Sequence, residues 1–288
     1  MIAEAGFTLR AVGRLADAVE PIRAGAEGDL KLESWRNAAI SYGNLSELLL
    51  TLGNVPEAVA AARQAVDFAD RSGNAFQRMG QRATLAGALH QLGDLAAARR
   101  LFADAERLQA ENQPEYPILY SLQGYRYCDL LLVQGETAEV LRRASQTLRW
   151  AEEERSLLSI GLDCLSLGCA HPSGSAEAAH HLDQAVEFLR HAGQLDYLTR
   201  ALLARGTPHD LDEVFRIATR SGMRLFLADY HLAMASNALT AGDRPKAREH
   251  FEKAEALVQA TGYHRRDPDL AKLRAELGEK SLAADEGG

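Results

Sequence analysis

The side chains best suited to metal binding lie together in one short segment, HPSGSAEAAHHLD (171–183). His180 and Asp183 are three residues apart, so on a helix they would share a face, and His171 could approach them through the preceding loop. A protein metal site needs three or four converging donors, which this segment does not clearly supply. We interpret these side chains as the polar face of a solvated helix and expect no bound metal ion.

The three cysteines do not have the spacing of a catalytic or redox pair. Cys164 and Cys169 are five residues apart on one expected helix, so their side chains point about 140° apart. Together with Cys128 they make an odd number, which indicates free thiols in a reducing compartment rather than a disulfide framework. The carboxylates at 152–154 belong to a charged run at a helix end, which is typical of a solvated surface rather than of acid–base catalysis.

Sequence motifs that carry enzyme chemistry are missing from the chain. It contains no G-x-x-x-x-G-K-[ST] loop for phosphate, no G-x-S-x-G turn for a nucleophilic serine, no H-E-x-x-H pair and no C-x-x-C pair. We therefore expect neither enzymatic activity nor a cofactor.

Charge and hydropathy restrict the classes of partner. The net charge of −8 lacks the basic surplus of a general nucleic-acid binder, so a nucleic-acid partner would need a local basic patch, and we do not expect one. No stretch approaches roughly 18 consecutive apolar residues, so we expect no membrane partner. The start, MIAEAGFTLRAVGR, does not resemble a signal peptide, which predicts a cytoplasmic protein.

The elements that position these side chains follow from a recurring motif: an apolar segment, a glycine turn and an alanine-centred segment. The turns lie at Gly13, Gly53, Gly93 and Gly135, near residues 173 and 206, and at Gly242. The first four are spaced by 40, 40 and 42 residues, and the later spacings shorten to 38, 33 and 36. We expect this shortening to tighten or kink the array after residue 170.

The segment after each turn has a small–large–small pattern with spacings of four and three residues. Ala98, Phe102 and Ala105 show it in the third unit, and residues 247–254 repeat it in the last. Such positions share one helix face, where small residues let two helices approach and the large residue fills the groove. Glycine permits the tight turn between the helices. A polar residue that can cap the second helix follows three of the turns: Asn54, Asp94 and Asp243.

This pattern resembles the tetratricopeptide repeat, and the period near 40 residues resembles a longer variant found in C-terminal regions of bacterial signalling ATPases and transcription activators of the STAND class. The resemblance covers residues 2–260 as seven units. It implies an all-α fold, an α-solenoid wound as a right-handed superhelix. We expect one domain over 1–280, with a capping helix near 267–277 after the connection ATGYHRRD (260–267), and a disordered tail at 281–288.

The repeat frame predicts the positions of the paired helices. First helices are expected near 2–12, 34–52, 75–92, 115–134, 155–170, 194–205 and 223–241. Second helices are expected near 16–29, 56–72, 96–112, 138–153, 175–192, 210–221 and 245–260.

The first helices of such an array line its concave surface, where solenoid proteins bind their partners. The frame places eight candidate partner-binding side chains there: Asn44, Glu47, Arg78, His90, Tyr125, Arg126, Asp129 and Asp163. Gly80 and Gly87 would leave the groove shallow and open to an incoming backbone. Half of the eight tyrosines fall within 116–127, and tyrosine suits recognition surfaces, although Tyr127 falls on a core position.

We predict an interaction module that binds a protein or peptide on this surface, and in a larger signalling protein it would be the sensor or scaffold arm. A carboxylate clamp of the chaperone-binding type is not expected: Asn44 matches, but Gly43 and Thr84 stand where lysine and asparagine are needed. The alternatives are a small-ligand or nucleic-acid sensor and a self-assembling scaffold. Because the first helix begins near Met1 without a polar cap, we expect either a piece of a larger protein or a chain that covers this end with its own helix or as a homodimer.

Overall fold

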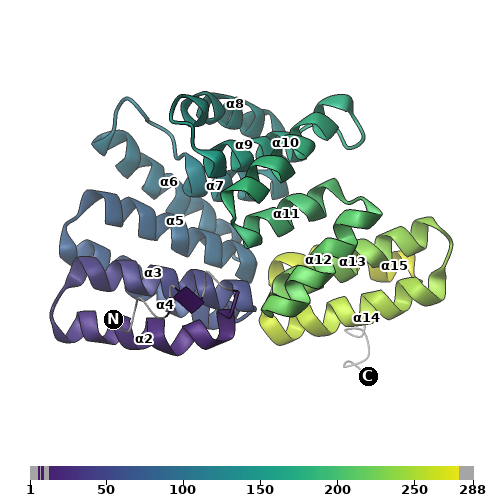
Figure 1. Cartoon of the computed structure of the whole chain (residues 1–288), viewed down its shortest axis with the longest axis horizontal. Helices are drawn as coiled ribbons and strands as arrows, with labels where there is room; N and C mark the ends of the chain where they lie inside the picture. Colours follow the sequence, from purple (N-terminus) through teal and green to yellow (C-terminus); the bar gives the residue numbers. More distant parts are fainter. Residues whose placement is uncertain (1–5, 7, 10–12, 279–288) are drawn as a thin grey trace, which may run out of the picture.

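The computed structural model describes residues 6, 8–9 and 13–278, and this part of the chain contains helices and turns but no strand. Fourteen α-helices, α2 to α15, and one short 3-10 helix, η1, follow one another, and successive helices pack together (Figure 1). The expected all-α solenoid is confirmed. The tail at 281–288 and most of the helix expected near 2–12 lie outside the described residues.

The observed helices follow the predicted pairing. The first helices are α3 (Trp35–Leu52), α5 (Ala75–Leu92), α7 (Ser121–Val133), α9 (Leu157–Ala170), α11 (Leu195–Arg205) and α13 (Arg224–Thr240). The second helices are α2 (Leu15–Lys31), α4 (Val55–Ser72), α6 (Leu95–Asn112), α8 (Thr137–Glu153), α10 (Ala176–Ala192), α12 (Pro208–Ser221) and α14 (Arg244–Thr261). The chain then forms η1 (His264–Arg266) and the expected last helix, α15 (Asp267–Glu276).

The predicted small–large–small face is buried, as α6 shows. Ala98, Phe102 and Ala105 of α6 are completely buried, and the Phe102 ring stacks on Tyr127 with 4.9 Å between ring centroids. Burying one such phenylalanine contributes roughly 1.5–3 kcal/mol. Of the predicted caps, Asp94 and Asp243 accept a hydrogen bond from the first turn of the next helix, whereas Asn54 does not.

The largest difference from the predicted boundaries is the start of α7, expected near 115 and found at Ser121. Pro117 disfavours helical geometry in the residue before it and lacks a backbone N–H, so the segment before Ser121 stays irregular. Tyr116 and Tyr120 in this segment pack edge-on against Trp150 of α8, with ring centroids 5.0 and 6.2 Å apart. These two tyrosines therefore cover α8 and do not lie on the concave surface.

The solenoid closes on itself, because the last unit returns to the second and third. Helix α13 packs against α3, and η1 packs against α5, so the two arms of the molecule meet (Figure 1). Val55 of α4 shares a buried apolar cluster with Leu225 and Tyr263, and Phe226 shares another with Leu49. The units after residue 170 thus curve strongly enough to bring the C-terminal unit back onto the N-terminal half.

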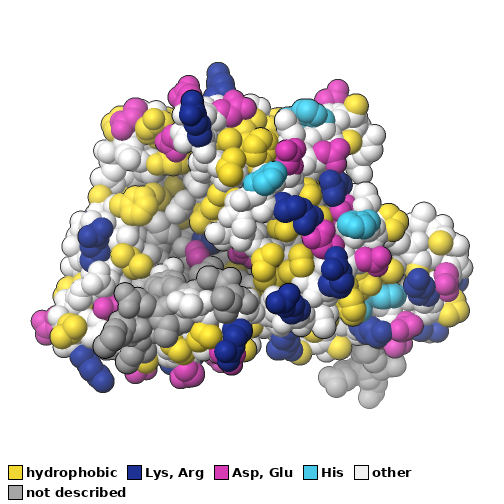
Figure 2. Space-filling view, in the orientation of Figure 1, with side chains coloured by type: hydrophobic (Ala, Val, Ile, Leu, Met, Phe, Trp, Pro, Cys, Tyr) yellow, Lys and Arg dark blue, Asp and Glu magenta, His cyan; other side chains and the backbone are white. Residues whose placement is uncertain are grey.

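The outer surface carries mixed charge. On the face shown in Figure 2, basic and acidic side chains are interspersed without a continuous basic patch. The two most exposed large apolar side chains of the described residues are Leu32 and Phe76, which belong to different units. Within the described residues, no helix combines the length and the apolar character needed to cross a membrane.

At one turn glycine, the closing contact leaves no room for a side chain. Gly53 has φ +85°, and a Cβ added to it would lie 2.8 Å from Arg224 Cβ and 2.8 Å from Thr261 Cγ2. We expect Gly53→Ala to lower the free energy of unfolding by about 2–3 kcal/mol, because left-handed backbone strain and a clash at the closure add together. Urea-induced unfolding followed by circular dichroism measures this change.

Gly73→Ala is the matched control for this prediction. Gly73 also ends a helix, with φ +64°, but a Cβ added there would meet nothing within 4 Å. The decrease in the free energy of unfolding of Gly73→Ala should be limited to the backbone strain, about 1 kcal/mol. Equal losses for the two variants would mean that the closure does not constrain Gly53.

Candidate functional site

Closure of the solenoid surrounds two adjoining cavities. The inner chamber, of about 50 Å³, is lined from α3 (46–51), α5 (84–91), α7 (125–129), α11 (196–200) and α13 (225–226). The outer cavity, of about 600 Å³, is lined from α7 (125–133), α9 (165–169), α11 (200–204), α13 (229–236) and the C-terminal segment 265–276, with Thr137 of α8. Tyr125, Asp129 and Arg200 line both, so they form the boundary between the two cavities.

Arg126 crosses the inner chamber from α7 to α3. Its Nη2 donates to Glu47 Oε1 at 2.8 Å and to the Tyr197 hydroxyl at 3.2 Å, and its Nη1 donates to Thr84 Oγ1 at 3.3 Å. A Cβ added to Gly87 would lie 3.3 Å from Arg126 Cδ, so the glycine makes room for this side chain. The expectation that Gly87 leaves an open groove for a partner is therefore wrong, because Arg126 occupies that space.

Asp129 holds the returning C-terminal segment. Arg265 of η1 donates to both carboxylate oxygens of Asp129, at 2.5 and 2.6 Å, and to Gln91 Oε1 at 3.3 Å. Burial alone would raise the pKa of the Asp129 carboxyl, but Arg265 outweighs burial and holds that pKa well below its usual range. This bidentate ion pair joins α7 to a segment 136 residues away in the sequence.

Arg266 forms a further ion pair inside the closed solenoid. Its Nε donates to Asp229 Oδ1 of α13 at 2.7 Å, and the Tyr263 hydroxyl donates to Asp229 Oδ2 at 3.2 Å. The short η1 segment thus supplies two neighbouring guanidinium groups to the interior. Each of them has a carboxylate partner.

His90 of α5 is buried beside the Asp129 pair. The residue is 1% exposed, and its Nδ1 lies 3.7 Å from Asp129 Oδ2. Its Nε2 is buried and has no hydrogen-bond partner among the described residues. Burial first, and then the positive charge of Arg265, lower the pKa of His90 to about 3. The imidazole is therefore neutral at physiological pH, with one unsatisfied nitrogen in the wall of the inner chamber.

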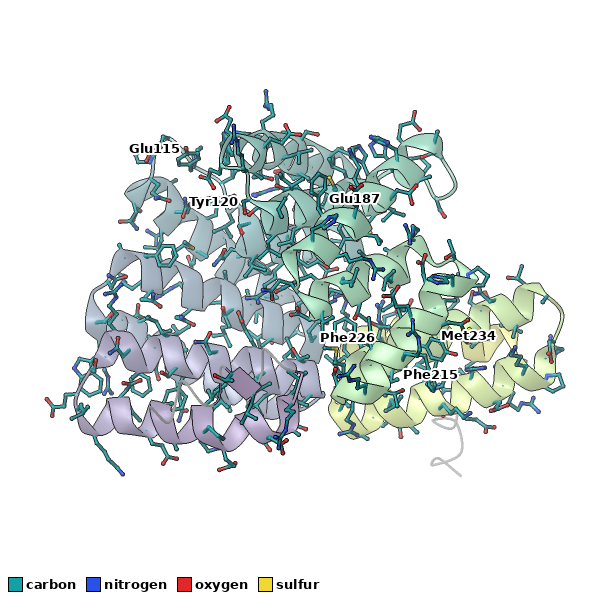
Figure 3. All side chains as sticks on the ribbon, viewed as in Figure 1. Glu115, Tyr120, Glu187, Phe215, Phe226 and Met234 are labelled. Atoms are coloured by element: carbon teal, nitrogen blue, oxygen red, sulfur yellow. The ribbon has the colours of Figure 1, made fainter. Side chains whose placement is uncertain are left out.

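Arg200 of α11 differs from the other arginines of the cavities. Within the described part of the chain, no carboxylate lies within 4.0 Å of its guanidinium group, whose carbon lies 5.1 Å from the centre of the Phe226 ring. Figure 3 labels Phe226, which lies where the two arms of the solenoid meet. Neighbouring Tyr125 and Asp129 outweigh the effect of burial and raise the pKa of Arg200 above its ordinary value, so it stays charged.

Five of the eight predicted concave residues line the inner chamber: Glu47, His90, Tyr125, Arg126 and Asp129. The other three line neither cavity. Asn44 is half-buried elsewhere on α3, and Arg78 lies near the start of α5, where it pairs with the exposed carboxylate of Asp70 at 3.2 Å. Asp163 is buried between α9 and α8, where its Oδ1 accepts a hydrogen bond from Thr147 Oγ1 at 2.7 Å.

The sequence reasoning missed Arg200, Arg265 and Arg266. A signal for Arg200 was present, since it lies six residues before the turn glycine Gly206, just as Asp129 lies six before Gly135. No repeat position indicates Arg265 and Arg266, because they belong to a connection between helices.

The groups considered for metal and thiol chemistry are engaged otherwise or buried. His171 stacks on His181 with 5.6 Å between ring centroids, and Asp183 pairs with Arg205 at 3.0 Å. No group of three or more potential ligands is arranged for a metal ion among the described residues. Burial raises the pKa values of the Cys128 and Cys164 thiols to about 12, which disfavours the reactive thiolate. Cys169 is exposed and lines the outer cavity.

No protein-family model matches this chain, and no curated protein matches it. The class of this protein is therefore defined by its fold and cavities: it is an all-α solenoid closed around an interior lined by both charged and apolar side chains.

Proposed function

We propose that this protein is a non-catalytic binding module that takes up a short segment of a protein partner in its outer cavity. The observation that carries the proposal is the outer cavity itself, whose volume of about 600 Å³ lies in the range typical of ligand sites. Its walls combine apolar side chains such as Leu132 and Leu232 with charged ones such as Arg200. Such a mixture suits a peptide, which brings both apolar side chains and polar backbone groups.

The closure restricts the form of the bound segment. The last unit packs across the interior of the solenoid through η1 and α15, so a long helix along the whole concave surface would collide with it. A short extended segment or a chain end avoids this collision. The resemblance to tetratricopeptide repeats supports the proposal, since arrays of that kind use their concave surface for binding.

A cytoplasmic location is part of the proposal and is supported by the three free cysteines, two of which are buried. The alternative of a nucleic-acid partner finds less support, because the charges on the visible face are mixed (Figure 2). A homodimer through a solenoid end stays an alternative, although at the C-terminal end α15 packs on α13 and α14 within the same chain.

Filling the outer cavity should abolish partner binding. Ala233 of α13 lines this cavity, and we expect Ala233→Trp to reduce recovery of the partner at least tenfold, because the indole ring would occupy the space of the segment. Recovery is measured by affinity purification from the native host followed by quantitative mass spectrometry.

Asn237→Trp provides the matched control, because Asn237 lies one turn further along α13, is exposed and does not line the outer cavity. This variant should recover the partner at the wild-type level. Recovery of the same proteins by Ala233→Trp at wild-type level would place the binding surface outside the cavity and overturn the proposal.

A further inference from the structure

The boundary between the inner chamber and the outer cavity contains a guanidinium group without a carboxylate. Arg126, Arg265 and Arg266 each pair with a carboxylate, whereas among the described residues Arg200 has no carboxylate within 4.0 Å and lies over the Phe226 ring. We infer that this boundary is an anion-binding site, in which Arg200 pairs with a single carboxylate or phosphate group of a ligand. This inference does not depend on whether the rest of the ligand is a peptide or a small molecule.

The surroundings of Arg200 leave it available for a ligand. Two carboxylates that line the outer cavity, Asp129 and Asp229, are already engaged by Arg265 and Arg266. The Arg200 guanidinium stays charged and has no carboxylate within 4.0 Å among the described residues, so an anion that reaches it can form a charge-assisted contact. Its guanidinium presents a planar set of donors that matches a carboxylate or phosphate.

His90 supplies a second, independent polar contact. Its Nε2 is buried without a partner, and its Nδ1 faces the carboxylate of Asp129 at 3.7 Å. The negative charge of Asp129 favours a proton on Nδ1, so that Nε2 is a free acceptor. The site therefore suits an anion that also carries a hydrogen-bond donor, such as hydrogenphosphate or a 2-hydroxy or 2-amino carboxylate.

The size of the inner chamber limits what enters it. A volume of about 50 Å³ is space for roughly four water molecules. Only the anionic group and one or two neighbouring atoms fit, and the remainder of the ligand must extend into the outer cavity.

NMR titration of the full-length protein with three small anions tests the inference. The probes are inorganic phosphate, glycolate and acetate, each added against sodium chloride at constant ionic strength. We expect amide shifts at Arg200 and His90 with phosphate or glycolate. Acetate, which lacks the hydroxyl donor, should bind at least threefold more weakly than glycolate. Binding of phosphate alone would identify the natural group as a phosphate, and binding of glycolate alone would identify it as a carboxylate.

Variants of the two residues separate the site from general charge effects. Arg200→Met should raise the dissociation constant of the bound anion at least tenfold, and Arg200→Lys should restore part of the affinity. Arg220→Met is the control, because Arg220 is exposed on α12 and lines neither cavity. In His90→Met the preference for glycolate over acetate should disappear. Circular dichroism confirms that each variant is folded.

The inference is overturned if phosphate and glycolate shift no resonance beyond the chloride control, or if Arg200→Met binds them as wild type does. These results are independent of partner recovery by Ala233→Trp. A protein that binds the anions but keeps its partner in Ala233→Trp would retain this site and lose the proposed function.

Discussion

Replacing Asp129 by alanine is expected to lower the free energy of unfolding by about 3–5 kcal/mol, the usual cost of leaving one member of a buried ion pair alone. Arg265, the partner, is 7% exposed and would keep only its contact with Gln91. The loss should be large because this pair joins α7 to the C-terminal unit and so holds the solenoid closed. Equilibrium unfolding in urea at pH 7 measures it.

The control for this variant is an exposed ion pair of the same chemistry. Asp70 is 41% exposed and pairs with Arg78 and Arg82, so Asp70→Ala should cost no more than about 1 kcal/mol. If the two variants lose the same stability, the Asp129 pair does not hold the closure.

Acid gives a second check on Asp129. Because the folded-state pKa of its carboxyl is depressed, its contribution is present above the unfolded-state pKa and is lost as the pH falls below about 4. The difference in stability between wild type and Asp129→Ala should therefore shrink in acid. A difference that stays constant down to pH 3 would contradict the assigned role of the carboxylate.

Local patterns predicted the helices well because each helix pair is specified by its own residues. The segments expected at 34–52 and 75–92 are found at Trp35–Leu52 and Ala75–Leu92. Gly53 and Gly93 adopt the left-handed conformation that the turns require. The expected start at 115 was wrong because proline and aromatic packing against Trp150 override the apolar spacing there.

The closure could not be predicted, because it depends on small rotations accumulated over several units rather than on any local pattern. Arg265 and Asp129 are 136 residues apart, and nothing in the connection 260–267 marks it as a segment that enters the interior. The shortened spacings indicated tighter curvature after residue 170 but not where the chain would return.

The candidate site was predictable in part through one repeat position. The residues six before the turn glycines include Glu47, Gly87, Asp129, Arg200 and Ser236, and all five line a cavity. This position faces the interior in these five units, so the repeat itself predicts that Arg200 lines a cavity. Asp163 was misplaced because it lies ten residues before Ser173 and faces the neighbouring helix α8 instead.

Asp163 has a buried carboxyl group whose titration is expected to make the stability of the protein depend on pH. The residue is 3% exposed, Thr147 donates to its Oδ1, and its Oδ2 has no hydrogen-bond partner in the part of the chain that the structure describes. Within the described residues, no basic side chain lies within 4.0 Å of this carboxylate. Burial raises the pKa of Asp163 to about 7.

The sign of the effect follows from this raised pKa. The folded protein binds the proton more tightly than the unfolded chain, whose carboxyl has a pKa of about 3.9. Protonation of Asp163 therefore stabilises the folded protein. This stabilisation is fully present below about pH 4 and is lost as the pH rises through about 7. A difference of about three pKa units corresponds to about 4 kcal/mol at most.

We expect Asp163→Asn to remove most of this pH dependence, because asparagine keeps the acceptor for Thr147 and has no charge to bury. At pH 8.5 the variant should be about 2–4 kcal/mol more stable than wild type. At pH 5, which is still above the unfolded-state pKa, the difference should fall to about 1.5 kcal/mol or less. Urea unfolding at these two pH values measures it, with the exposed Asp104→Asn of α6 as a control that should leave the pH dependence unchanged. Parallel pH profiles for wild type and Asp163→Asn would show that the buried carboxylate does not titrate between pH 5 and 8.5.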